Sequence, residues 1–201
     1  MLPIAADLNK NIGTYYFSEE LLDQDIQNLE NEVVGLVNDA LIDKNGDVEE
    51  IVTSLKQGDD KIIMTLNYED FKASSENLQI ALSFDQAQDQ LAAFLSNIET
   101  AAGPSSVANR LVSVRRLEKR NVLLPDGSIL GQVDKVVMNK TQDQVIGVLV
   151  KDISTRPQYE RIALPYPMGL RLKNTGLSND LELAEEYVET VLELTAEGIP
   201  K

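Results

Sequence analysis

The segments VVGLVND at residues 33–39 and ILGQVDK at residues 129–135 decide the fold of this chain. Each opens an apolar stretch, and each carries a glycine at its third place, Gly35 and Gly131. Aligning the two glycines places the segments 96 residues apart (131 − 35). The chain therefore contains an internal repeat, which is a stronger guide to its structure than any single residue.

The similarity continues on both sides of these segments, with an offset that rises by one residue at a time. Because loops accept insertions more readily than strands do, we interpret the chain as two copies of one small domain. A period near 96 residues is too long for a solenoid and predicts two separate cores, at residues 1–100 and 110–201, joined by a linker at 101–109. The matched positions are Ser18 with Ser113 (offset 95), Val48 with Val145 (offset 97) and Leu66 with Leu164 (offset 98).

Composition limits the class of protein. The 201 residues are 43% apolar and 25% charged, as in folded soluble domains. No apolar run reaches the roughly 20 residues that a transmembrane helix needs. The chain has no cysteine and no histidine, which excludes disulfides, thiolate metal sites and the commonest general base. MLPIAAD is interpreted either as a native start or as the remnant of a trimmed signal sequence behind an added methionine. The missing cysteine, together with the second interpretation, slightly favours the periplasm or cell envelope over the cytoplasm.

Charge is divided unevenly along the chain. Residues 1–100 hold 20 acidic and 5 basic residues, a net of −15 that equals the net charge of the whole chain. Residues 101–179 hold 6 acidic and 12 basic residues, whereas residues 180–197 hold seven acidic residues and no base. The body of the second repeat is therefore basic and the first repeat acidic, an asymmetry that bears on partners and not on fold.

The apolar pattern predicts short strands with tight turns. Strands are expected near residues 33–42 and 48–55, joined by DKNGD, in which Asn45-Gly46 is typical of a type I′ hairpin turn. Further strands are expected at KIIMTL and NLQIAL, and at RIALPY and GLRLKN in the second copy. The pattern predicts a mainly β protein with one small antiparallel barrel in each half.

A helix is expected to close each barrel. Ser83 and Gln86 form a capping box before FDQAQDQLAAFLSNI. Asn179 and Glu182 are predicted to make the same cap before LELAEEYVETVLELTA. The apolar stripes of these two helices are Phe84, Ala87, Leu91, Phe94, Leu95 and Ile98 in the first, and Leu181, Ala184, Tyr187, Val188, Val191 and Leu194 in the second.

The repeated unit resembles the PRC-barrel domain. The likeness rests on a short capped turn, an hh-G-x-V-[ND] strand, a hairpin, a strand ending in L-x-Y and a closing strand, over about residues 15–95 and 110–195. That family includes the cytoplasmic domain of the photosynthetic reaction-centre H subunit and the C-terminal domain of a ribosome-maturation factor. The resemblance implies two tandem barrels and a non-enzymatic binding or assembly module.

Motifs for catalysis or metal binding are weak. DKNGD imitates the start of a calcium loop, but Val48 and Ser54 stand where that loop needs glycine and glutamate. Carboxylate pairs such as Asp59-Asp60 have no neighbouring cation or histidine and are read as solvated surface. Ser113 and Ser128 have no histidine to activate them. We therefore expect no catalytic residue, no metal and no cofactor.

A basic segment opens the second repeat and is the candidate binding site. Its five cations lie within eleven residues and are opposed only by Glu118. They are Arg110, Arg115, Arg116, Lys119 and Arg120. Arginine suits carboxylate or phosphate, so the segment is expected to contact acidic surface of its own chain or of a homodimer partner, to remain solvated, or to bind an external anion.

These observations predict a non-enzymatic adaptor that binds a partner protein. The alternatives are an RNA or ribosome-assembly module that uses residues 110–120, and a carrier of a metal or small ligand. Nucleic acid is disfavoured as a partner because a net charge of −15 repels phosphate.

Overall fold

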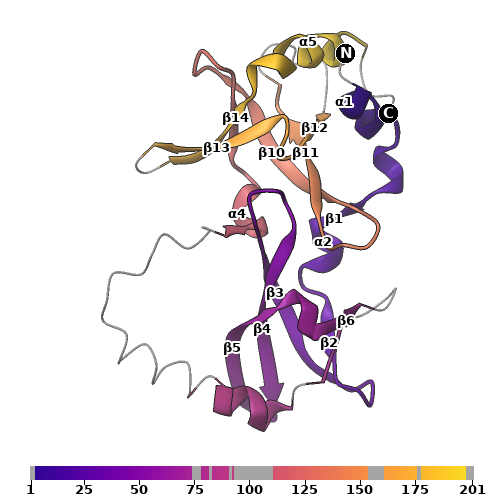
Figure 1. Cartoon of the computed structure of the whole chain (residues 1–201), viewed down its shortest axis with the longest axis vertical. Coiled ribbons are helices and arrows are strands. Elements are labelled where there is room, and N and C mark those ends of the chain that lie inside the picture. Colours follow the sequence, from indigo (N-terminus) through magenta and orange to yellow (C-terminus); the bar gives the residue numbers. More distant parts are fainter. Residues whose placement is uncertain are drawn as a thin grey trace. The chain divides into compact units, whose positions relative to one another are not determined.

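The computed structural model describes residues 3–73, 78–81, 83–90, 92, 111–153, 161–175 and 178–197 (Figure 1). The fold is mainly β, as predicted, and contains two seven-stranded sheets in two compact units. The repeat-1 unit comprises Glu20–Lys44 and Val48–Ser113. The repeat-2 unit comprises Met1–Glu19, Asn45–Asp47 and Val114–Lys201. In this division the chain changes unit after Glu19, Lys44, Asp47 and Ser113. The two predicted domains, residues 1–100 and 110–201 with a linker at 101–109, stay a prediction.

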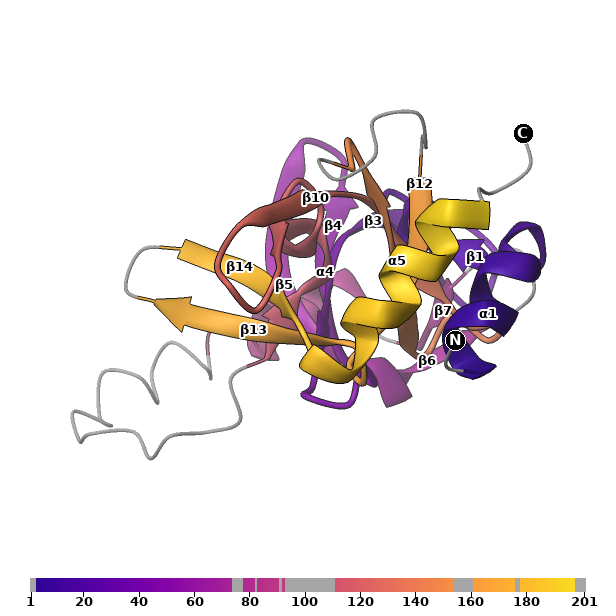
Figure 2. The ribbon, with the colours of Figure 1, turned by 90° about the horizontal axis from the view of Figure 1, so that it is seen from above.

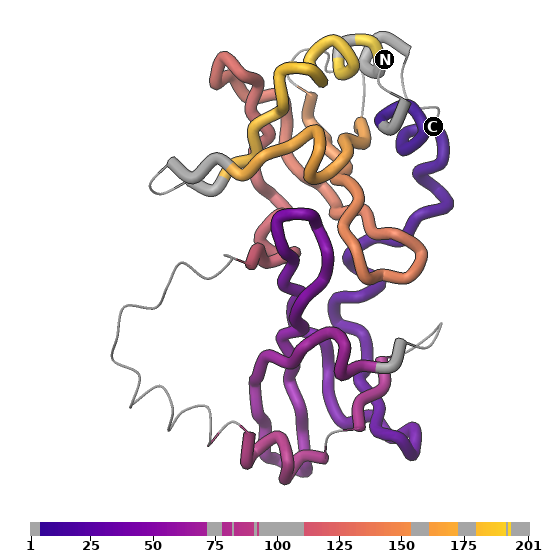
Figure 3. The backbone as a smooth tube through the Cα atoms, in the orientation of Figure 1, coloured from indigo at the N-terminus to yellow at the C-terminus, as the bar shows by residue number. Residues whose placement is uncertain are grey.

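The repeat-1 sheet has the strand order β5-β4-β3-β2-β7-β6. Its centre is the long hairpin of β3 and β4, which the backbone trace in Figure 3 shows clearly. The bounds are β2 Asp25–Gln27, β3 Val33–Ile42, β4 Val48–Gln57, β5 Asp60–Asn67, β6 Phe71–Ala73 and β7 Leu78–Ile80. A short helix, α2 Ser18–Leu21, precedes this sheet, and a single 3-10 turn, η2 Tyr68–Asp70, joins β5 to β6.

The repeat-2 sheet has the matching order β12-β11-β10-β9-β14-β13. The bounds are β9 Asn121–Leu123, β10 Ile129–Met138, β11 Val145–Lys151, β12 Arg161–Pro165, β13 Leu170–Thr175 and β14 Ser178–Leu183. Helix α4 Val114–Leu117 precedes β9. Two further helices, α1 Pro3–Lys10 and α5 Val188–Glu197, lie against β12 (Figure 2). The connecting 3-10 turns are η1 Ile12–Thr14 and η3 Glu185–Tyr187.

The two sheets share one register through their first half. Ile26 pairs with Gly35 in one sheet, and Val122 pairs with Gly131 in the other, each partner shifted by 96 residues. The left-handed residues before these strands, Asp23 (φ 67°) and Lys119 (φ 64°), have the same offset. The repeat alignment is therefore confirmed at the paired glycines.

The predicted offset of 95 before these strands is wrong. Helices α2 and α4 match at 96, so Ser18 corresponds to Val114 and not to Ser113. Both helices end on a fully buried leucine, Leu21 and Leu117. Burial of this leucine fixes the register, whereas the serine match was a coincidence of composition.

Each sheet gains one short strand from the residues that precede the other repeat. Strand β1, Tyr16–Phe17, pairs with Met138 and Val137 of β10. Strand β8, Val112–Ser113, pairs with Ile42 and Leu41 of β3. Tyr16 and Phe17 of β1 correspond to Val112 and Ser113 of β8 at an offset of 96 residues. Their partners Met138 and Val137 correspond to Ile42 and Leu41 at the same offset. Separate folding of the two predicted cores, with the second taken from residue 105 inside the linker, stays a prediction. A cut between residues 100 and 105 would remove β1 from β10.

The barrel prediction is confirmed only in its coarse form. Most neighbouring strands are antiparallel, but β2 pairs with β7, and β9 with β14, in parallel. One sheet curves into a half-barrel. Within the described residues, the two end strands of each path are not paired to each other, β5 with β6 in one sheet and β12 with β13 in the other. The closing strands β7 and β14 each form an antiparallel pair with the strand before them, β6 or β13. Each then lies beside the first short strand of its sheet, β2 or β9, and runs parallel to it.

The first predicted helix cap is confirmed, and the second is wrong. The Ser83 backbone N–H donates to Gln86 Oε1 at 2.9 Å, and the Gln86 N–H donates to Ser83 Oγ at 3.2 Å. Residues 84–90 are helical, while Leu91, Phe94, Leu95 and Ile98 of the predicted stripe lie outside the described residues or side chains. Asn179 and Glu182 instead lie in β14, paired with β13. The alternation of polar and apolar residues in SNDLEL is compatible with a strand, and these residues form β14. The helix α5 begins only at Val188.

The DKNGD turn departs from the predicted type I′ geometry. Gly46 has φ 91°, but Asn45 is not among the described residues with positive φ. Asp47 forms a β-bridge with Gln144, whose side-chain amide donates to Asp47 Oδ1 at 2.7 Å. The backbone N–H of Val145 donates to the Gly46 carbonyl at 2.8 Å. These tertiary hydrogen bonds, and not the local dipeptide preference, set the conformation of the turn.

Candidate functional site

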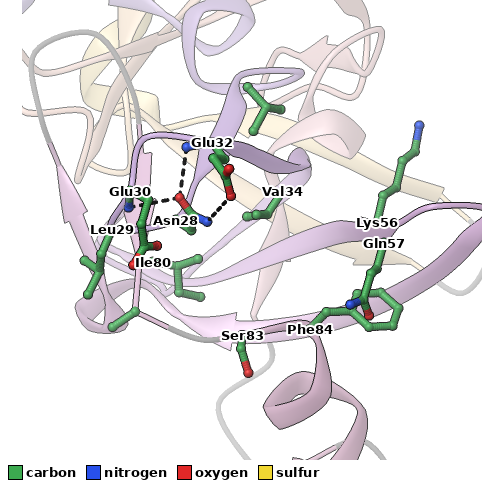
Figure 4. A pocket seen from close by; sticks show the side chains of 12 residues that line it. Asn28, Leu29, Glu30, Glu32, Val34, Lys56, Gln57, Ile80, Ser83 and Phe84 are labelled. Atoms are coloured by element: carbon green, nitrogen blue, oxygen red, sulfur yellow. Dashed lines mark hydrogen bonds between the residues drawn. The ribbon is translucent and has the colours of Figure 1, made fainter.

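A hollow of the repeat-1 unit lies beside the turn between β2 and β3, and we call it the β2–β3 pocket (Figure 4). It has a volume of about 500 Å³. In Figure 4, Leu29 and Ile80 lie on one side of it, and Gln57 and Phe84 lie on the other. The lining is Asn28, Leu29, Glu30, Glu32, Val33, Val34, Lys56, Gln57, Ile80, Ala81, Ser83 and Phe84.

One side of the pocket is a tightly hydrogen-bonded turn. Asn28 Oδ1 accepts from the backbone N–H groups of Glu30 at 3.0 Å and Glu32 at 2.9 Å. Asn28 Nδ2 donates to Glu32 Oε2 at 3.0 Å. Asn31 takes the left-handed conformation, with φ 65°, and its Oδ1 accepts from Gln79 Nε2 at 2.8 Å. This network ties the turn to β7, so the pocket wall is held in place without a ligand.

The rim of the pocket exposes large apolar side chains. Leu29 is 54% exposed and Val33 is 58% exposed, although both are aliphatic. Ile80, at the base, is only 2% exposed. A hollow with an apolar base and exposed apolar edges is typical of a binding site for an apolar group.

The charges around the pocket are mostly negative. Glu30 and Glu32 are exposed carboxylates on the β2–β3 turn. Lys56 is the one cation in the pocket lining, and in Figure 4 its chain extends away from the turn. The turn side of the pocket is therefore an acidic surface beside an apolar one.

A second, smaller hollow of about 250 Å³ continues this surface and shares two residues with the first, Ile80 and Ala81. It is also lined by Leu66, Asp70, Gln86 and Gln90. The start of the helix capped by Ser83 lies between the two hollows. Residues at the end of β7, Ile80 and Ala81, therefore line both hollows.

The matching turn of the repeat-2 unit has the same backbone form with different side chains. Gly127, with φ 85°, stands where the first repeat has Asn31. Leu124 N–H donates to the Ser128 carbonyl at 2.8 Å, as Asn28 N–H donates to that of Glu32. Asp126 Oδ1 accepts from the Ser128 backbone N–H at 2.9 Å and its hydroxyl at 2.6 Å.

These hydrogen bonds from Ser128 lower the pKa of Asp126 below its ordinary value of 3.8. We expect Ser128→Ala to raise the pKa of Asp126 toward that value, because the hydroxyl bond is lost. Ionised Asp126 stabilises this turn above the ordinary pKa, and the contribution is lost as pH falls through the lowered one. Titration of the Asp126 carboxyl carbon by NMR measures the shift. An unchanged pKa in the alanine variant would show that the hydroxyl has no part in it.

Four of the five predicted cations lie within the described residues, on α4 and in the turn that follows it. Arg115 and Arg116 are exposed on α4, and Lys119 is exposed in the left-handed turn that follows. Arg120 is half-buried, and its Nε donates to the Arg116 carbonyl. Arg110 lies outside the described residues.

The electrostatic surroundings of Arg120 are mixed. Burial lowers the pKa of Arg120, the charge of Asp180 opposes that change, and neighbouring Arg116 adds to it. Glu118, the acid within the segment, accepts from Ser18 Oγ at 2.7 Å. The segment therefore has acidic neighbours within its own unit, and its role as a binding site stays a prediction.

Other cations of the second repeat are also paired within their unit. Asp134 lies between Lys151 Nζ at 2.9 Å and Arg161 at 3.1 Å, and its side chain is 13% exposed. Lys135 Nζ lies 2.7 Å from Glu19 Oε2 and 5.1 Å from the centre of the Phe17 ring. Part of the basic surplus is thus matched locally.

Sequence patterns did not indicate the β2–β3 pocket. The signal available was the mixture of two apolar residues with two acidic residues and two asparagines in NLENEV at residues 28–33, which resembles any polar turn. Only the packing of the turn against the ends of β4 and β7 shows that Leu29 and Val33 remain exposed.

The described part of the chain contains no group of three or more metal-binding side chains. None of its helices has the length and apolar character needed to cross a membrane. No known family matches the chain, and no curated protein matches it either.

Proposed function

We propose that this chain is a non-enzymatic adaptor with two PRC-barrel-like repeats, and that the β2–β3 pocket binds a segment of a partner protein. The observation that carries the proposal is the pair of exposed aliphatic side chains, Leu29 and Val33, at the rim of a preformed hollow. A turn held by four side-chain hydrogen bonds, three of Asn28 and one of Asn31, has little freedom left to lose on binding. Preorganisation and exposed apolar area together favour a binding surface over a solvated loop.

The lining of the pocket supports a particular chemistry for the proposed partner segment. An apolar side chain such as leucine or phenylalanine would fill the space above Ile80 and remove Leu29 and Val33 from water. A lysine or arginine next to it would face Glu30 and Glu32. We therefore propose a partner segment with an apolar anchor beside a basic residue, for which the acidic charge of the first repeat raises the association rate.

A peptide selection on the intact chain tests this proposal. Immobilised protein is used to select from a random displayed peptide library, and binding of the selected peptides is measured by fluorescence anisotropy. We expect enrichment of an apolar residue adjacent to lysine or arginine. Val33→Ser and Leu29→Ser should each weaken binding by about tenfold, the loss expected for a rim contact worth roughly 1.4 kcal/mol.

Ile63→Ser is the matched control. Ile63 has the same 58% exposure as Val33 but lies on β5, away from the pocket lining. It should leave peptide binding unchanged. A selection without an apolar–basic pattern, or equal losses from Val33→Ser and Ile63→Ser, would contradict the proposed site.

A further inference from the structure

The N-terminal segment completes the repeat-2 unit as a docked arm. We define the arm as residues 3–17, which include α1, η1 and β1. Its strand β1 extends the sheet at Val137 and Met138 of β10. Its helix lies against β12, one end of the sheet order. The chain then continues from Glu20 as part of the repeat-1 unit.

A single asparagine gives the arm a specific contact with the end of this sheet. Asn9 Nδ2 donates to the Ala163 carbonyl at 2.7 Å, and Asn9 Oδ1 accepts from the Ala163 N–H at 2.8 Å. The carboxamide thus supplies both hydrogen bonds that a neighbouring strand would supply at this residue. An uncovered strand edge invites pairing with other chains, so Asn9 protects β12 at this residue.

Apolar packing also holds the arm against β10, β11 and β12. Leu8 is 4% exposed and packs with Val137, Leu149 and Ala163. A Cβ at Gly147 would lie 2.6 Å from Leu8 Cδ2, so the glycine leaves room for this leucine. The residues of the arm that add to this cluster are Ile12, Tyr15 and Phe17.

The second repeat has an equivalent leading strand, and it too completes the other repeat. β8 pairs with β3 at Leu41 and Ile42, in the register of β1 on β10. Each sheet is therefore finished by the strand that precedes the other repeat. This is the connectivity of an arm-exchanged dimer, contained in one chain.

We propose that the arm site of the repeat-2 unit also accepts the arm of a second copy, so that two chains exchange residues 3–17. The contacts in the exchanged form are the same as those in the single chain, because the same residues meet. The balance between the two forms is then set by protein concentration and by strain in the connection after Phe17. This inference does not depend on the β2–β3 pocket.

A cysteine trap in the intact, naturally cysteine-free chain tests the exchange. One copy carries Leu8→Cys and a second, differently tagged copy carries Ala163→Cys. After mixing under mild oxidation, we expect a disulfide between the two copies whose yield rises with protein concentration. Higher salt should raise the yield further, because it screens the repulsion between chains of charge −15.

The single chain with both cysteines is the geometric reference and should form the bond internally at any concentration. Should the two sulfurs not meet in that reference, a short bismaleimide that spans a wider separation repeats both measurements. Gly13→Cys mixed with Ala163→Cys is the matched control, since nothing lies within 4 Å of a Cβ at Gly13. An internal bond without any bond between copies would overturn arm exchange, and so would equal yields from Leu8→Cys and Gly13→Cys.

Discussion

Replacing Leu117 by alanine is expected to lower the free energy of unfolding of the repeat-2 unit by about 2–5 kcal/mol. Leu117 is fully buried at the end of α4, two residues before the left-handed residue Lys119. The Lys119 N–H donates to the Val133 carbonyl at 2.8 Å, and the Val133 N–H donates to that of Arg120 at the same distance. The Leu117 side chain therefore anchors the turn that leads into β9. These hydrogen bonds hold the turn in place, so the surrounding structure cannot readily collapse into the cavity that alanine would leave.

Leu21 is the equivalent residue of the first repeat and is also fully buried. Leu21→Ala should cause a loss of the same order in the repeat-1 unit. Urea unfolding followed by far-ultraviolet circular dichroism measures both, since the chain contains no tryptophan. Ile63→Ala, at a 58% exposed position, is the control and should cost well under the core values. Losses at Leu21 and Leu117 no larger than the control would contradict the shared anchoring role.

Valine at Gly35 or Gly131 is expected to destabilise the chain by roughly 1–3 kcal/mol. A Cβ at Gly35 would lie 2.5 Å from the Ser54 carbonyl oxygen, and one at Gly131 would lie 2.5 Å from that of Lys151. Backbone atoms of a paired strand cannot move aside as a flexible side chain can. Both glycines also lie at a register shift between β2 and β3, or between β9 and β10, where an added side chain would disturb the bulge.

Gly13→Ala is the matched control for this pair, since a Cβ there meets open space. It should leave the unfolding midpoint unchanged or raise it slightly, because alanine restricts the unfolded chain. Thermal unfolding of the three variants makes the comparison. Wild-type stability of Gly35→Val and Gly131→Val would mean that the glycines are incidental to the repeat.

The site was less accessible to sequence reasoning than the fold. The basic segment stood out because its charge is concentrated within eleven residues, and the structure keeps Arg115, Arg116 and Lys119 exposed. Leu29 and Val33 gave no such signal, because a local pattern does not show whether an apolar side chain is covered. Burial depends on residues distant in sequence, here the ends of β4 and β7.

The amino-acid sequence by itself determined the repeat, the strand hairpins and the first helix cap. These features depend on contacts over a few residues: the alternation in β3 and β4, the glycine at each bulge, and the mutual hydrogen bonds of Ser83 and Gln86. Local periodicity is visible in a single chain because the residues that produce it are neighbours.

Tertiary structure alone decided where each unit begins and how its sheet is finished. The pairing of β1 with β10 joins residues about 120 positions apart. No local pattern in Tyr16-Phe17 indicates which strand these two residues pair with. SNDLEL likewise satisfies a helix cap and a strand equally well until β13 and β9 bind its two edges. Two-residue strands and short polar segments carry too little local free energy to select a structure, so their long-range hydrogen bonds and burial make the choice.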